Sequence, residues 1–186
     1  ILGTRARKIR SKSFAAFDSI GYPIAAFIDD NRIIKYLEAP VVQGEVRFAP
    51  SISDSVFLLK LIPGIRPEIL AYLGEHYDII VIESYGVGGI PFYDKRNFMN
   101  ELRTLTEKGK IIVIATQVML EGSDAEKYEV GALALDRYNV LQSFDMTVES
   151  TVTKLMWLCA EHSDYEEIRD GFYTCINHDL LYEPKS

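Results

Sequence analysis

The sequence predicts an α/β protein built on a parallel sheet, and two observations support this. Short and almost purely apolar runs recur after residue 55, most clearly at 79–82 and 111–115. Such runs are typical of strands buried on both faces, as in parallel sheets. Stretches of helical periodicity separate the runs, and this alternation with short connections indicates a parallel sheet covered on both faces.

The first three elements are expected at residues 56–62, 67–73 and 78–83, as strand, helix and strand. Pro67 suits the first turn of the helix, where a missing N–H breaks no hydrogen bond. Three glycines follow the second strand within six residues, at 86, 88 and 89. They predict a turn that larger side chains would obstruct.

Asp94 is expected to cap the next helix, which carries Phe98, Leu102 and Leu105 at helical spacing and ends at residues 108–109. A third strand is expected at residues 111–115. Two further helices follow the apolar stripes of residues 148–159 and 165–172, and an aspartate precedes the second one.

Residues 1–50 follow a different pattern from residues 51–186, and we expect two domains with this boundary. The first part offers short strands at 33–37 and 45–48, set among turns such as 21–23 and 29–31. Residues 50–54 are the candidate linker, because proline and serine interrupt both patterns there.

Composition restricts the function. The chain of 186 residues has a formal net charge of −7, which argues against a general nucleic-acid surface. Residues 1–12 are basic, and such a segment is more often a solvated edge or a pocket wall than a phosphate site. Cys159 and Cys175 are expected to be reduced thiols. No apolar run reaches the roughly 18 residues of a membrane span, and no signal peptide is visible.

Polar and glycine-rich motifs follow two of the predicted strands. Residues 84–89 end the second strand, Thr116 and Gln117 end the third, and a loop runs on from 121 to 131. Parallel strands bring these ends to one sheet edge, where ligands of open α/β sheets bind. The alternative is structural, with glycines serving turns and Thr116 and Gln117 satisfying loop backbone. The dinucleotide fingerprint is incomplete, the three histidines are scattered, and we predict no cofactor and no metal.

Four segments, in this order along the chain, together resemble one family. They are GTRARK at 3–8, SYGVGGIP at 84–91, TQVMLEGSDAEKYEVG at 116–131 and DMTVESTVTKL at 145–155. They resemble the bacterial L-asparaginases, particularly the cytoplasmic type I branch, and the resemblance spans essentially the whole chain. It covers only the C-terminal part of such an enzyme, because the family's Thr-Gly-Gly-Thr and Gly-Thr-Asp-Thr turns are missing.

The resemblance implies a flavodoxin-like parallel-sheet C-terminal domain, preceded by the end of a larger α/β N-terminal domain. It also implies hydrolysis of L-asparagine to L-aspartate and ammonia by a threonine nucleophile, with this fragment inactive alone. Lys8 matches the family's catalytic lysine, and Tyr128 matches a tyrosine near the substrate. If the family resemblance is set aside, Lys8 is expected to be a surface charge, and Tyr128 is expected to pack over the glycine turn. The alternatives are a subunit of a tRNA-dependent amidotransferase, or a non-catalytic asparagine-binding or dimerisation module.

Some type I members bind asparagine at a regulatory site, where Arg7, Glu83 and Val118 stand here. All three depart from the family pattern of a small polar residue, an arginine and a cysteine. We expect Arg7 and Glu83 to pair with each other and substrate activation to be weakened or lost. Allosteric or interface roles are also expected for four neighbours, namely Ser84, Gly88, Thr116 and Gln117.

The resemblance also implies partners and a location. It implies a homodimer or tetramer in which a neighbouring protomer completes the site, and a cytoplasmic protein that binds neither nucleic acid nor membrane. Where the periplasmic branch has asparagine in its glycine turn, this chain has Gly89 and Ile90. An asparagine contact from that turn is therefore not expected.

Overall fold

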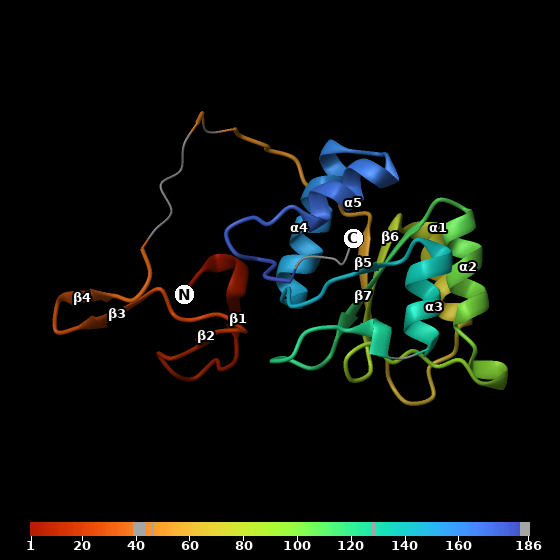
Figure 1. The fold of residues 1–186 in the computed structure, drawn as a ribbon, viewed down its shortest axis with the longest axis horizontal. Coiled ribbons are helices and arrows are strands. Elements are labelled where there is room, and N and C mark those ends of the chain that lie inside the picture. Colours follow the sequence, from red (N-terminus) through yellow and green to blue (C-terminus); the bar gives the residue numbers. More distant parts are fainter. Residues whose placement is uncertain (39–43, 46, 128, 183–186) are drawn as a thin grey trace.

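The structure is a computed structural model that describes residues 1–38, 44–45, 47–127 and 129–182. A parallel sheet with helices on both faces forms the main body, and four short N-terminal strands lie to one side of it (Figure 1). The α/β class and the parallel sheet predicted from the sequence are confirmed.

The main sheet has four parallel strands in the order β5-β6-β7-β8. They span Val56–Lys60 (β5), Ile79–Ser84 (β6), Ile111–Thr116 (β7) and Leu141–Gln142 (β8). Every residue of the two central strands β6 and β7 is buried. The apolar runs of the sequence are therefore the centre of the sheet, as strands covered on both faces require.

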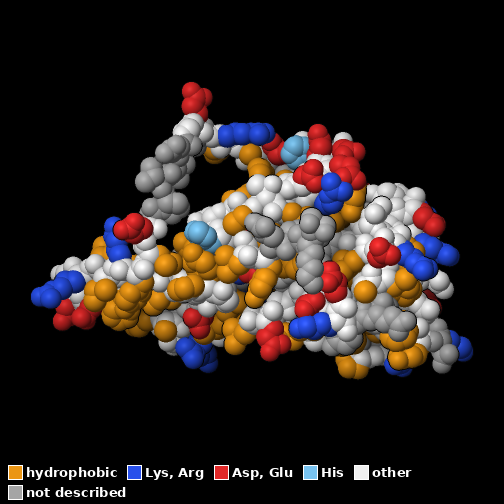
Figure 2. Space-filling view, in the orientation of Figure 1, with side chains coloured by type: hydrophobic (Ala, Val, Ile, Leu, Met, Phe, Trp, Pro, Cys, Tyr) orange, Lys and Arg blue, Asp and Glu red, His pale blue; other side chains and the backbone are white. Residues whose placement is uncertain are grey.

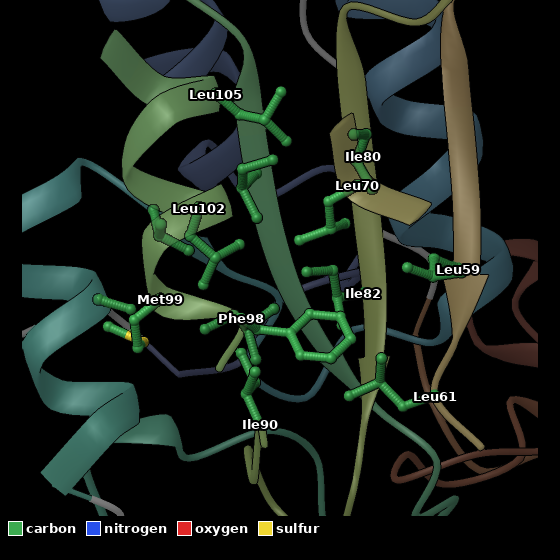
Figure 3. Close-up of a cluster of buried hydrophobic side chains, with 14 of the residues drawn as sticks. Leu59, Leu61, Leu70, Ile80, Ile82, Ile90, Phe98, Met99, Leu102 and Leu105 are labelled. Atoms are coloured by element: carbon green, nitrogen blue, oxygen red, sulfur yellow. The ribbon is translucent and has the colours of Figure 1, made fainter. Parts of the chain in front are cut away.

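Helices α1 (Glu68–His76), α2 (Met99–Glu107) and α3 (Glu129–Tyr138) cover one face of this sheet, whereas α4 (Val148–Glu161) and α5 (Tyr165–Tyr173) cover the other (Figure 1). Alternate residues of the two central strands enter opposite cores, because side chains of a strand alternate between its faces. Figure 3 shows one core, in which Ile80 and Ile82 lie beside Leu70 and Leu102. Burying each such side chain contributes about 1.5–3 kcal/mol.

The starts of two helices test the predicted caps. Asp164 begins α5 as expected, and its side chain accepts hydrogen bonds from the backbone N–H groups of the first turn. The cap predicted for α2 was wrong, because residues 94–96 form a separate 3-10 turn and the helix begins only at Met99. The Asn97 side chain accepts the Met99 N–H at 2.9 Å, so a nearer polar residue satisfies the free N–H of the first turn.

The N-terminal strands form two antiparallel pairs, β1 (Ala6–Lys8) with β2 (Phe17–Ser19) and β3 (Ala26–Asp29) with β4 (Arg32–Lys35). Asp30 and Asn31 join the second pair with φ angles of 40° and 65°. This two-residue turn with two positive φ angles matches the twist of a hairpin. The strand expected at 45–48 is absent from the described residues 45, 47 and 48. Among the helices that the structure describes, none is long and apolar enough to cross a membrane.

Candidate functional site

The carboxyl edge of the sheet is held together by the polar residues that end its central strands. Ser84 and Thr116 are register partners at the ends of β6 and β7. The Ser84 hydroxyl donates to the Ala115 carbonyl at 2.6 Å. The Thr116 hydroxyl donates to the Gly86 carbonyl and accepts the Val118 N–H at 2.9 Å. Both hydroxyls are therefore occupied in fixing the turns that leave the sheet.

Gln117 serves the same edge from inside. Its Nε2 donates to the carbonyl oxygens of Leu61 at 2.7 Å and Glu83 at 3.0 Å. One amide therefore joins the ends of β5, β6 and β7. These contacts are the ones expected if Thr116 and Gln117 have a structural role and satisfy loop backbone groups.

The glycine turn after β6 is shaped by close packing. Tyr85 and Gly89 exchange backbone hydrogen bonds of 3.0 and 2.7 Å, which close the turn. Gly88 has φ of +150°, and a Cβ added there would lie 2.5 Å from the Cα of Ala125. Ala125 begins the 3-10 turn η3 (Ala125–Lys127), so glycine at 88 permits two backbones to meet.

A pocket of about 330 Å³ lies between this edge, the first turn of α4 and the N-terminal strands. Of the predicted residues, Arg7, Thr116 and Val118 line it. The sequence did not single out Glu121 and Asp145, which also line it, as site residues. The structure thus brings three of the predicted residues together, and it adds two carboxylates to them.

Arg7 and Glu83 do not pair with each other, so that prediction was wrong. Arg7 Nε lies 3.1 Å from a carboxylate oxygen of Glu149, on the first turn of α4. Glu83 lies 3.4 Å from Lys60 Nζ. The reason is the register, since Lys60 stands directly opposite Glu83 on the neighbouring strand β5.

Lys8 is the last residue of β1, opposite Phe17 on β2, and its side chain is exposed. It does not line the 330 Å³ pocket within the described part of the chain. Tyr128 lies outside the described residues.

Arg5 is the residue that the sequence did not single out. It is fully buried, and its Nη2 lies 2.6 Å from Oδ2 of Asp145. Within the basic run of residues 1–12, nothing in the sequence distinguishes it from the more exposed basic residues. The only signal in the sequence was its place in the segment that resembles the family.

Two groups with clear pKa shifts, Tyr173 and Asp78, do not line the 330 Å³ pocket. Burial raises the pKa of Tyr173 to about 12, although its hydroxyl also accepts the Gln142 backbone N–H. The hydrogen bond from Lys110, 2.8 Å long, lowers the pKa of Asp78. Across the described residues, no group of three or more His, Cys, Asp or Glu side chains is placed to hold a metal ion.

Comparisons with known proteins agree with one another. Residues 55–172 match the family model of the glutaminase/asparaginase C-terminal domain. An L-asparaginase from Thermococcus kodakarensis is 40% identical over 169 residues, which are 91% of this chain and 51% of that protein. The solved structure of the thermostable L-asparaginase from the same organism superposes with a TM-score of 0.91 at 36% identity, covering 98% of this chain and 55% of that one.

A more distant relative has another name. A subunit of the glutamyl-tRNA(Gln) amidotransferase from Metallosphaera sedula is 29% identical over 171 residues, which cover 90% of this chain and 38% of that protein. The chain therefore spans about half the length, or less, of the curated relatives that it matches.

Proposed function

Because the chain belongs to the glutaminase/asparaginase C-terminal domain family, we propose that it is the C-terminal part of an L-asparaginase. The reaction would be hydrolysis of L-asparagine to L-aspartate and ammonia. The observation that carries this proposal is the 40% identity to an L-asparaginase across 91% of the chain.

We also propose that residues 1–50 are the end of the N-terminal domain of that enzyme, with residues 51–186 as its C-terminal domain. The side chains support this division. Figure 2 shows hydrophobic side chains gathered over the β3–β4 hairpin at the edge of the molecule. They include exposed Phe27, Ile28 and Ile33, which a further domain would cover.

In the proposed mechanism, a threonine of the N-terminal half adds its hydroxyl oxygen to the amide carbon of asparagine. The C–N bond breaks, ammonia leaves, and water hydrolyses the ester to release aspartate. Lys8 accepts the proton of the threonine hydroxyl and passes it toward the leaving ammonia. Tyr128 contacts the substrate. The fragment alone is inactive, because it supplies Lys8 without the nucleophile.

The 330 Å³ pocket is proposed to be a regulatory or interface region. Arg7 is bound to Glu149 and Glu83 to Lys60, which supports weakened activation by asparagine. Ser84, Gly88, Thr116 and Gln117 would shape this edge for contact with a neighbouring protomer. A homodimer or tetramer and a cytoplasmic location rest on the family resemblance.

The test is asparagine hydrolysis by the protein with its N-terminal half, comparing Lys8→Met with Lys12→Met. Loss of general acid–base catalysis lowers kcat by about 100-fold or more, which we expect for Lys8→Met. Lys12→Met is the matched control, because it removes an exposed amine from the same segment. Near-normal turnover of Lys8→Met would reject the role of Lys8.

The similarity to an amidotransferase subunit favours a second candidate function. In that case, ammonia release would require a partner subunit and tRNA. The same assay, repeated with both of them added, would detect this requirement. A non-catalytic asparagine-binding or dimerisation module remains the third reading. Calorimetry of this chain alone separates it, since a binding module takes up asparagine without the N-terminal half.

A further inference from the structure

We propose that Arg5 is a positioning residue for Lys8, which fastens the strand carrying Lys8 to the C-terminal domain. The proposal rests on the proposed function, in which Lys8 moves a proton. The positioning of Lys8 is assigned to the buried side chain of Arg5, three residues before it along the chain. Arg5 itself does not touch the substrate in this account.

The Arg5 guanidinium is held by three strong hydrogen bonds. Nη2 donates to Oδ2 of Asp145 at 2.6 Å, and Nη1 donates to the Asp145 carbonyl at 2.7 Å. Nε donates to the His178 carbonyl at 2.6 Å. Tyr22 covers the group, with its ring centre 5.8 Å from Cζ. Because the guanidinium is planar, these three hydrogen bonds fix both its position and its orientation.

Asp145 connects three parts of the molecule. Its Oδ2 accepts the hydrogen bond from Arg5 Nη2. Its Oδ1 accepts hydrogen bonds from the backbone N–H groups of Leu181 at 3.0 Å and Tyr182 at 3.3 Å. Asp145 lies in the loop that leads into α4, so the N-terminal segment, this loop and the C-terminal segment meet there. A single carboxylate therefore sets their relative positions.

The C-terminal segment is itself anchored by a second buried ion pair. Lys154 Nζ lies 2.7 Å from Oδ2 of Asp179, and their side chains are only 4% and 2% exposed. Asp179 Oδ1 also accepts the Ile176 N–H at 2.7 Å. The carbonyl that receives Arg5 Nε, on His178, is therefore part of a rigid turn.

The backbone carries the position of Arg5 to Lys8. The Arg5 carbonyl accepts the Ile20 N–H at 2.9 Å, and strand β1 follows at once with Lys8 opposite Phe17. At about 3.3 Å per residue, Lys8 lies roughly 10 Å along the strand from Arg5. From Lys8 to Ser13 every side chain is exposed, so Arg5 is the residue nearest to Lys8 along the chain whose side chain is buried.

Arg7, which is closer to Lys8, does not replace this anchor. Its partner Glu149 is 50% exposed, and exposed ion pairs fix little. A misplacement of about 1 Å at a reacting group can cost about 100-fold in rate. The strand therefore needs one firm point. Among residues 1–10, all of which the structure describes, only the Arg5 side chain is buried.

The experiment uses the protein with its N-terminal half and compares Arg5→Lys and Arg5→Met with Leu105→Ala. Leu105 is a matched control for stability, because it is 2% exposed in the core on the opposite face of the sheet. All rates are measured well below each melting temperature. We expect kcat for asparagine to fall about tenfold in Arg5→Lys and further in Arg5→Met, with KM nearly unchanged. Leu105→Ala should lower the melting temperature and keep kcat.

A second readout does not depend on activity. The rate at which Lys8 is acetylated by an activated ester, followed by mass spectrometry over a range of pH, should change in the Arg5 variants and not in Leu105→Ala. If the parent protein fails to hydrolyse asparagine, the proposed function falls, and this labelling still decides the role of Arg5. Parent-like kcat together with parent-like labelling in Arg5→Lys would overturn the positioning role, as would an equal loss of kcat in Leu105→Ala.

Discussion

Residues 1–50 and residues 51–182 use their hydrophobic side chains in opposite ways. In the second region, strands and helices bury leucine, isoleucine and phenylalanine in two cores, one on each face of the sheet. In the first region, Ile20 is the sole hydrophobic side chain in the described residues that is buried. Many large ones are exposed there, including Phe14, Phe17, Phe27, Ile28, Ile33, Ile34, Tyr36 and Phe48.

The difference shows where each region obtains its stability. The two cores give residues 51–182 the burial that an independent domain needs. Residues 1–50 have hairpins without a core, and two-stranded hairpins are marginal in water. The buried Arg5 side chain attaches them to the rest through its ion pair with Asp145. The exposed faces are therefore interpreted as surfaces that belong against the proposed N-terminal half.

The largest effect is expected from matched isoleucine truncations in the two regions. Ile114 on β7 is 0% exposed, whereas Ile33 on β4 is 66% exposed. Ile114→Ala should lower the free energy of unfolding of this chain by about 2–5 kcal/mol, because it leaves a cavity. Ile33→Ala should change it by less than about 0.5 kcal/mol, since surface substitutions cost little. Urea unfolding of both variants measures this, and similar costs would remove the contrast between the regions.

A smaller effect is expected from alanine at two glycines with positive φ. Gly88 has φ of +150° and a neighbour 2.5 Å from the added Cβ, whereas Gly44 has φ of +111° and open space. Both variants strain the backbone, and only Gly88→Ala also overpacks, which costs about 1–3 kcal/mol more. Thermal unfolding compares them. Equal losses in melting temperature would contradict this prediction, because they would show that the contact between the added Cβ and Ala125 does not destabilise the protein.

A third effect, confined to alkaline pH, concerns Tyr173 in the second region. Burial raises its pKa from 10.0 to about 12, so the folded state favours the neutral phenol. The resulting stability is complete below the unfolded pKa and is lost as pH rises through the folded one, by about 2–3 kcal/mol in total. Urea unfolding at pH 9 and pH 11.5 should show a smaller decline for Tyr173→Phe than for the parent. An identical decline in both would contradict the role of Tyr173.

The central fold was predictable because its signals are local. The runs at 79–82 and 111–115 became β6 and β7, and Asp164 caps α5 as its position indicated. Helix α3 and strand β8 were missed. The two residues of β8 are too few to show a period, and α3 follows a segment that was interpreted as a loop.

The site was predictable only in part, because its contacts join distant segments. Arg7, Thr116 and Val118 line one pocket as their positions suggested, and Glu83 pairs instead with its register partner on β5. The burial of Arg5 depends on Asp145, which is 140 residues away. A basic run read by itself cannot show which arginine has such a partner.

Hydrogen exchange tests the central claim most directly, namely that residues 1–50 belong to a unit completed by the N-terminal half. The backbone amides of Phe27 and Ile33 are compared with those of Ile80 and Ile112, in this chain and in the protein with that half. We predict that the amides of β6 and β7 are protected in both proteins, and that those of β3 and β4 are protected only in the longer one. Equal exchange of the β3–β4 hairpin in both proteins would contradict the account.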